Sequence, residues 1–180
     1  MRLFLALCIP RMEREKIFSL QRRLVHGRAV NVDDLHITLV FLGNGTTHMI
    51  DELEDALVGL TLVLPPVKLS VPGVFGRAQL RSAWLGVTPN GPLEILHKKI
   101  ARRALEVGFD VPKRKYVPHV TLARFSPSNS NSSQVAAHFE GHSAKEFESF
   151  QPLSVTLFRS MIGGEAPIYD ALASFPISPP

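Results

Sequence analysis

Hydrophobic positions along the chain change repeatedly between the two-residue period of a strand and the spacing of an amphipathic helix. Apolar runs bounded by Gly, Pro and polar residues predict strands at residues 2–9, 35–42, 67–76, 82–88 and 119–125. Apolar stripes at helical spacing predict helices at residues 10–25, 47–60 and 92–109. A short helix is expected at residues 133–139, followed by a closing hairpin built from residues 147–160 and 168–177.

This order of elements predicts one α+β domain over residues 1–180. In each half, a strand and a helix accompany a strand that begins with His and carries Thr two positions later. We therefore expect two similar lobes, one carrying each of these strands, related by a pseudo-two-fold axis. A chain of this length can bury a substantial core.

Composition narrows the class of protein only slightly. Hydrophobic residues make up 45% of the chain and charged residues 20%, which is ordinary for a soluble globular domain. The net charge of +4 is compatible with an anionic partner, but it is far from the charge of a chromatin protein. Cys8 is the single cysteine, which excludes an internal disulfide and a cysteine-rich zinc site, and its apolar surroundings predict that it is buried.

The apolar run at residues 3–9 has some features of a signal peptide. It is short, it ends at Pro10, and the charged stretch RMEREK follows without a small-residue cleavage site. No later segment approaches the roughly 20 apolar residues that span a membrane. We therefore interpret the run as a first strand and expect a cytoplasmic protein without membrane contact.

One short pattern occurs twice, as LHITLVFLG at residues 35–43 and as PHVTLARF at residues 118–125. By chance, a chain of this composition is expected to contain on the order of 0.01 copies of His-apolar-Thr-Leu. Side chains alternate between the two faces of a strand, so each copy places its His and Thr on one face and its apolar residues on the other. Two polar residues on the inner face of a strand are costly unless they have partners, which favours a functional role for both copies.

Two such faces, brought together, would supply two imidazoles and two hydroxyls. Imidazoles with separated pKa values can act as general base and general acid in one displacement. Threonine hydroxyls can donate hydrogen bonds to the oxygens of a tetrahedral anion. A phosphodiester suits this arrangement, because one histidine can activate water while the other protonates the departing oxygen, without a metal or another cofactor.

With these motifs, the chain resembles the two-histidine phosphoesterases, and more narrowly the RNA 2′,3′-cyclic phosphodiesterases, also called 2′-5′ RNA ligases (LigT-like). The resemblance extends to MRLFLAL, RSAWLGV and the closing GGEAPIYDALASFPI, in the order of the family. It implies a bilobal α+β fold in which two antiparallel β-sheets line a central cleft and the helices lie outside. It also implies metal-free hydrolysis of a terminal 2′,3′-cyclic phosphate on RNA to a 2′-phosphate, with reverse 2′-5′ ligation as a possible side activity.

Carried over by the motifs, the resemblance implies that His36 is the general acid and His119 the general base. Thr38 and Thr121 would then bind the phosphate. The family also uses positions just after the motifs, which correspond here to Phe41 and Arg124, for the substrate. Strict alternation places Arg124 on the face opposite His119, so this role requires a bulge or the end of the strand.

Basic residues cluster shortly before the second motif, in PKRKYVPH. We expect Arg114 to attract RNA phosphates, and basic residues at positions 98, 99, 102 and 103 to be either part of that surface or an ordinary solvated helix face. Tyr116, Trp84 and Tyr169 are candidates for stacking on a base, although single aromatics in strands more often belong to the core. Tyr116 is the aromatic residue that we place in the substrate site.

Other patterns are weaker. His138 and His142 have a spacing that can hold a metal on a helix, but Gly141 interrupts the helix and no third ligand is evident, so no metal is expected. The Ser- and Asn-rich stretch at residues 126–133 is expected to be a loop that could border the substrate groove.

The expected partners are RNA ends or small 2′,3′-cyclic nucleotides, bound by a monomer. Two alternatives are a nucleotide- or RNA-binding module without turnover and a related phosphoesterase acting on a non-RNA cyclic phosphate. Both motifs being intact argues against a module that only binds, because binding does not need two titrating groups.

Overall fold

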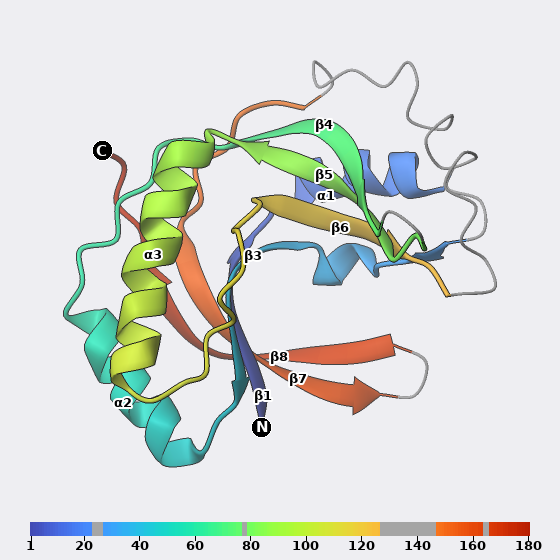
Figure 1. Cartoon of the computed structure of the whole chain (residues 1–180). Helices are drawn as coiled ribbons and strands as arrows, with labels where there is room; N and C mark the ends of the chain where they lie inside the picture. The colour runs from blue at the N-terminus through green and yellow to red at the C-terminus, as the bar shows by residue number, and fades with distance from the viewer. Residues whose placement is uncertain (23–26, 77–78, 127–146, 164–165) are drawn as a thin grey trace.

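A computed structural model of the chain describes residues 1–22, 27–76, 79–126, 147–163 and 166–180 (Figure 1). Its helices are α1 (Arg11–Gln21), η1 (Val32–Asp34), α2 (Thr47–Val58) and α3 (Asn90–Glu106). Its strands are β1 (Arg2–Cys8), β2 (Arg28–Ala29), β3 (His36–Asn44), β4 (Lys68–Phe75), β5 (Ser82–Thr88), β6 (His119–Arg124), β7 (Ser154–Gly163) and β8 (Ala166–Pro176). The expected long helices and the strands match these elements to within a few residues at most ends. The short helix expected at 133–139 and nearly all of the 126–133 loop lie outside the described residues.

Among the described residues, eight strands form one antiparallel sheet with the order β4-β5-β6-β3-β1-β7-β8, and β2 pairs with β6. The predicted α+β class is confirmed. The two expected sheets are the two halves of this sheet, one built on β1 and β3 and the other on β5 and β6. The halves meet where β3 pairs with β6 through Ile37 and Val120.

The helices cover the apolar side of the sheet. α2 and α3 lie side by side, and α3 contacts β3, whereas α1 contacts β6 in the other half (Figure 1). The core contains fully buried strand residues such as Leu5, Leu7 and Ile37, and helix residues such as Leu53 and Ile100. Thr46 caps the N-terminus of α2, and its side-chain oxygen accepts a hydrogen bond from the Met49 amide at 3.3 Å.

A β-bulge follows each His-x-Thr motif at the same position. Along β3, Thr38 pairs with Ala6 and Val40 pairs with Leu5, so Leu39 is the extra residue. Along β6, Thr121 pairs with Trp84 and Ala123 pairs with Ala83, so Leu122 is the extra residue. The burial pattern over 36–41 and over 119–124 is the same: half-buried, buried, half-buried, buried, buried, exposed. The repeat expected from the motifs therefore extends to the backbone.

Each bulge changes the phase of the strand that contains it. Without it, the fifth residue after each histidine would point to the opposite face of the sheet. The bulge returns Phe41 and Arg124 to the faces of His36 and His119, respectively. The condition that strict alternation imposes on Arg124 is thus met by a bulge at Leu122.

Cys8 differs from its prediction. The structure places it at the end of β1, exposed, with its Cα opposite that of His36 and its sulfur 3.8 Å from the Thr156 hydroxyl. The prediction of a buried thiol is wrong, because the residue lies on the open face of the sheet and not among the leucines of the apolar face.

Candidate active site

The pairing of Ile37 with Val120 brings the two motifs together. Both of these residues are fully buried on the apolar face, so the neighbouring motif residues point to the other face of the same sheet. In this antiparallel register, His36 comes opposite Thr121 and Thr38 comes opposite His119. Two imidazoles and two hydroxyls from residues far apart in the chain therefore share one small area.

Both imidazoles are oriented in the same way. The Nδ1–H of His36 donates to the Asp34 carbonyl at 2.7 Å, and the Nδ1–H of His119 donates to the Val117 carbonyl at 2.6 Å. Because a carbonyl oxygen only accepts, Nδ1 carries the hydrogen in each ring. The Nε2 atom of each neutral ring is left as the atom able to take a proton.

The threonines are placed differently. The Thr38 hydroxyl lies 3.1 Å from Nε2 of His36, where it can donate to the unprotonated nitrogen. The half-buried Thr121 hydroxyl makes no hydrogen bond within the described part of the chain. Both hydroxyls are near the imidazoles, and that of Thr121 is available to a ligand.

Burial and nearby charge lower the pKa of both histidines. For His36, burial of the ring lowers the pKa to about 4, the bond to Asp34 opposes this, and the charges of Arg124 and His119 add to the lowering. For His119, burial is again the main cause, with the Val117 carbonyl opposing and Arg114 and Arg124 adding. Without a ligand, both rings are therefore predominantly neutral near pH 7.

Aromatic rings surround each histidine. Around His36, the ring of Phe4 lies 5.0 Å away and that of Tyr169 meets it edge-on at 5.4 Å. Around His119, Phe75 meets the ring edge-on at 4.9 Å and Trp84 lies at 6.0 Å. Phe4 and Phe75 were missed by the sequence analysis, since single aromatics in strands carry no signal of which residue they will touch. Trp84 and Tyr169, which were considered as stacking candidates, both contact a motif histidine.

Phe41 and Arg114 lie together, with the guanidinium carbon 5.1 Å from the centre of the Phe41 ring. Phe41 is exposed, and the charge of Arg114 acts on His119. Arg124 acts on both histidines. Three of the residues expected to bind substrate are therefore at the edge of the histidine pair.

Tyr116 makes its contacts within the protein. Its ring stacks on His97 with a centroid distance of 4.3 Å, and its hydroxyl donates to the Thr38 carbonyl at 3.3 Å. Burial raises its pKa. These contacts hold Tyr116 against the backbone of the first motif.

Side chains from two helices hold the bulges. The Nδ1–H of His97, on α3, donates to the Leu39 carbonyl at 2.7 Å. The amide of Gln21, the last residue of α1, donates to the Leu122 carbonyl at 2.7 Å and to the Val30 carbonyl at 2.9 Å. Each bulge residue thus has its carbonyl bound by one helix side chain, a relation that the sequence analysis did not predict.

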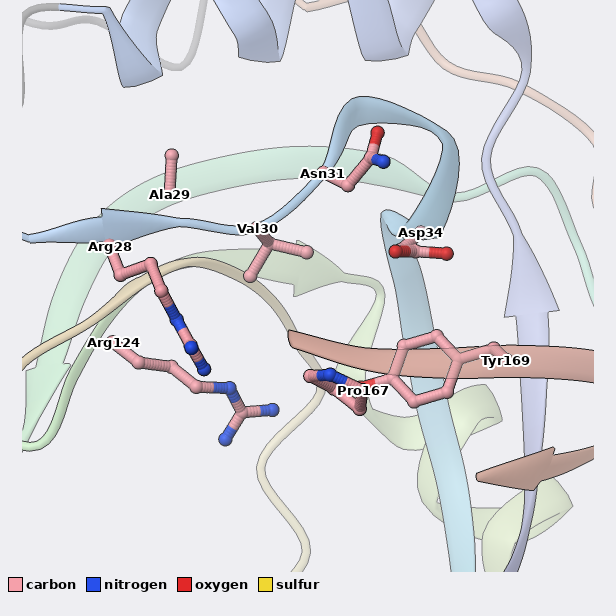
Figure 2. Close-up of a pocket in the computed structure, with 8 residues that line it drawn as sticks. All are labelled: Arg28, Ala29, Val30, Asn31, Asp34, Arg124, Pro167 and Tyr169. Carbon is pink, nitrogen blue, oxygen red and sulfur yellow. The ribbon is translucent and has the colours of Figure 1, made fainter. Parts of the chain in front are cut away.

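A pocket opens between β2 and the end of β6 on one side and β8 on the other, next to Asp34 (Figure 2). It measures about 320 Å³ with its open mouth included. It is lined by Arg28, Ala29, Val30, Asn31, Asp34, Arg124, Pro167 and Tyr169. Arg28 is a site residue that the sequence analysis missed, because β2 is only two residues long and gives no periodic signal.

The described residues contain no group of three or more His, Cys, Asp or Glu side chains that could hold a metal ion. His138 and His142 lie outside them. In the described part of the chain, no helix has the length and apolarity needed to cross a membrane.

An antiparallel α+β fold with two His-x-Thr strands joined on one face is the arrangement of the two-histidine phosphoesterases. A family model described as the 2′-5′ RNA ligase superfamily matches residues 10–160. The chain belongs to this superfamily.

Named relatives and solved structures agree with this assignment. The chain is 30% identical over 177 residues to a protein of Methanocaldococcus jannaschii named RNA 2′,3′-cyclic phosphodiesterase, covering 96% of this chain and 98% of the relative. A relative of the same name in Archaeoglobus fulgidus is 30% identical over 181 residues, covering 97% and 99%. The fold matches the crystal structure of Escherichia coli LigT complexed with 3′-AMP, with a TM-score of 0.79, 24% identity and 98% of each chain covered.

Proposed function

We propose that this chain is an RNA 2′,3′-cyclic phosphodiesterase that hydrolyses a terminal or nucleoside 2′,3′-cyclic phosphate to a 2′-phosphomonoester. The observation that carries the proposal is the pairing of Ile37 with Val120, which gathers both His-x-Thr pairs on one face. The names of the relatives support this substrate class.

In the proposed reaction, Nε2 of His119 takes a proton from water, and the water oxygen attacks phosphorus. The bond from phosphorus to O3′ breaks on the opposite side, and Nε2–H of His36 protonates O3′. The product is a 2′-phosphate with a free 3′-hydroxyl. The Nδ1–H bonds to the Asp34 and Val117 carbonyls fix the direction of both rings and stabilise the imidazolium form of each.

The acid must be protonated before it can act, whereas the empty site favours two neutral rings. A bound phosphodiester carries a negative charge, which raises the pKa of a nearby imidazole. We therefore propose that the substrate brings a proton into the site, and that His36 holds it. In the same state, His119 stays neutral and faces the attacking water.

The remaining residues bind the phosphate or hold the site. Thr38 and Thr121 donate hydrogen bonds to the non-bridging oxygens, and Arg124 and Arg114 supply positive charge beside them. Phe41, in contact with Arg114, supplies an exposed ring against which a base can stack. Tyr116, which the sequence places in the substrate site, supports the site through its hydrogen bond to the Thr38 carbonyl.

Two features of the proposal concern conditions and context. No step needs a metal ion, and the same steps with a 5′-hydroxyl in place of water would join it to a 2′,3′-cyclic end through a 2′-5′ linkage and free the 3′-hydroxyl. We further propose that the protein acts as a monomer in the cytoplasm, where RNA ends are its substrates.

The test is incubation with adenosine 2′,3′-cyclic phosphate in the presence of a chelator, with the product identified by phosphorus NMR. We expect a 2′-phosphate from the wild type. Binding without turnover would favour a nucleotide-binding module, and activity that is lost in chelator and restored by a metal ion would contradict the metal-free mechanism.

A further inference from the structure

We propose that Arg28, beside Arg124, forms a second phosphate subsite, which binds the phosphate on the 5′ side of the nucleotide that carries the cyclic phosphate. Arg124 then lies between this phosphate and the reactive one and contacts both. This inference rests on the proposed function and extends it from a reactive group to a substrate class. It makes a 5′-phosphorylated or internal nucleotide a better substrate than a nucleoside cyclic phosphate.

The two arginines are direct neighbours across a strand pair. Arg28 of β2 is paired with Arg124 of β6, and both side chains are exposed. Like charges directly opposite each other destabilise a sheet. Within the described residues, neither guanidinium has an ion pair or a side-chain hydrogen bond. An anion bound between them would offset the repulsion between the two positive charges and accept hydrogen bonds from both guanidinium groups.

Both guanidinium groups turn toward the same open space, and Tyr169 and Pro167 border it from β8 (Figure 2). Asp34 and Asn31 line the part of the pocket away from Arg124, where a carboxylate disfavours a phosphate and suits a hydroxyl or amino group. The charges thus place the phosphate at the arginine end and leave the other end for neutral parts of a nucleotide.

The pocket lies on the His36 side of the site. Tyr169, which lines it, meets the His36 ring edge-on, and Asp34, which also lines it, accepts the Nδ1–H bond of His36. In the proposed reaction, His36 protonates O3′, an atom that stays on the ribose. The nucleoside must therefore extend from the His36 side, where this pocket begins.

The position of Arg28 is fixed by the same bonds that hold the β6 bulge. The Val30 amide donates to the Leu122 carbonyl at 2.9 Å, and the amide of Gln21 bridges the carbonyls of Val30 and Leu122. β2 is short, but after Arg28 it is tied to β6 by the pairing of Ala29 with Ala123 and by the Val30 amide. Because the backbone of Arg28 is held in this way, little backbone freedom is lost when an anion binds.

The experiment compares kcat/KM for three substrates: adenosine 2′,3′-cyclic phosphate, its 5′-phosphate, and its 5′-methylphosphate, which carries the single charge of an RNA linkage. We expect the wild type to prefer both 5′-phosphorylated compounds by roughly 10- to 100-fold. In Arg28→Gln, we expect this ratio to fall by about tenfold. The control Arg102→Gln removes the same charge from the exposed face of α3 and is expected to keep the wild-type ratio.

A wild-type ratio near one would overturn the proposal, as would a ratio that is unchanged in Arg28→Gln. A preference for the 5′-phosphate but not for the 5′-methylphosphate would restrict the subsite to phosphomonoesters and contradict its role in RNA binding. If none of the three compounds is hydrolysed, the proposed function fails, and the subsite is then read from calorimetry. Tighter binding of adenosine 2′,5′-bisphosphate than of adenosine 2′-phosphate, lost in Arg28→Gln, would still support it, and equal binding would overturn it.

Discussion

At the scale of single residues, the two histidines are arranged alike but have different surroundings. Each ring donates from Nδ1 to the carbonyl two residues earlier in the chain. His36 is near Thr38, Arg124 and the other imidazole, whereas His119 is near Arg114 and Arg124. Different surroundings separate the pKa values of two groups that share one reaction.

The first prediction concerns the pH dependence of kcat/KM, which reports the free enzyme. The reaction needs one protonated and one neutral histidine. The form required here, with His36 protonated and His119 neutral, is the minor singly protonated form because His36 has the lower pKa. Its share is still highest between the pKa of His36, about 4, and that of His119, which is lowered from 6.5. We expect a bell-shaped profile with its maximum below pH 6.5 and a loss of kcat/KM as the pH rises above it. The maximum of kcat is expected at a higher pH than that of kcat/KM, because the bound phosphate raises the pKa values of both histidines. A kcat/KM maximum above pH 7 would contradict the pKa directions.

The second prediction concerns the Thr38 hydroxyl, which lies 3.1 Å from Nε2 of His36. Thr38→Val keeps the shape of the side chain and removes the hydroxyl. We expect kcat to fall by about 10²- to 10³-fold, with an unchanged circular dichroism spectrum. Thr38→Ser keeps the hydroxyl and is the matched control, expected to retain most of the activity. Equal rates for the valine and serine variants would exclude a role for the hydroxyl.

At the scale of secondary structure, the repeated unit is a motif strand with a bulge and a helix side chain that binds the bulge. His97 of α3 binds the Leu39 carbonyl, and Gln21 of α1 binds the Leu122 carbonyl. The bulges direct Phe41 and Arg124 toward the histidines. The helices therefore do more than cover the core, since each fixes the direction of residues in the site.

The third prediction tests Gln21 as a positioning residue. Gln21→Leu removes one buried and one partly buried hydrogen bond, and we expect a loss of about 1–3 kcal/mol in the free energy of unfolding, measured in urea. Because the bulge also positions Arg124 and β2, we expect KM to rise more than kcat falls. His97→Phe probes the other bulge. It keeps an aromatic ring stacked on Tyr116 but removes the hydrogen bond to the Leu39 carbonyl. A loss of stability with KM and kcat both unchanged would show that Gln21 only stabilises the fold.

The fourth prediction concerns the close contact between Gly73 of β4 and Trp84 of β5. A Cβ added at Gly73 would meet the Trp84 ring at a distance shorter than any normal contact, so the ring must move. Trp84 contacts His119, which links this packing to the site. We expect Gly73→Ala to cost about 1–3 kcal/mol of stability and to reduce kcat. Gly91→Ala, where a Cβ meets nothing within 4 Å, is the control and is expected to change neither. A Gly73→Ala protein as stable and active as wild type would contradict this account of the packing.

The sequence predicted most elements and the motif residues, because periodicity reports burial and the repeated motif reports polar residues on one face. It did not predict the bulge at Leu39, and it gave a bulge before Arg124 only as one of two ways to turn that side chain toward His119. The hydrophobic pattern of each strand ends within two residues of its bulge, so the pattern alone does not reveal it. It also missed Gln21 and Arg28, whose importance comes from what lies opposite them in space. Contacts between distant segments depend on strand order, which no local pattern contains.

At the scale of the whole molecule, two halves of one sheet meet at a single residue pair. Each half supplies one His-x-Thr motif, aromatic rings around its histidine, and a bulge. The substrate side chains differ between the halves, with Phe41 in one and Arg124 in the corresponding position of the other. The near-symmetric fold thus makes an asymmetric site, as a reaction with one acid and one base requires.

The most direct test of the central claim compares two substrates that differ in their leaving group, so that the acid and base roles of the two histidines can be told apart. Adenosine 2′,3′-cyclic phosphate loses an alkoxide, which needs a general acid, whereas 3′-deoxyadenosine 2′-(4-nitrophenyl phosphate) loses 4-nitrophenolate, which does not. We expect His36→Ala to lose at least about 10³-fold in kcat/KM on the cyclic phosphate but within about tenfold on the nitrophenyl ester. His119→Ala is expected to lose activity on both. The reverse pattern would exchange the two roles, and full activity of either variant on the cyclic phosphate would contradict the claim that the paired histidines catalyse its hydrolysis.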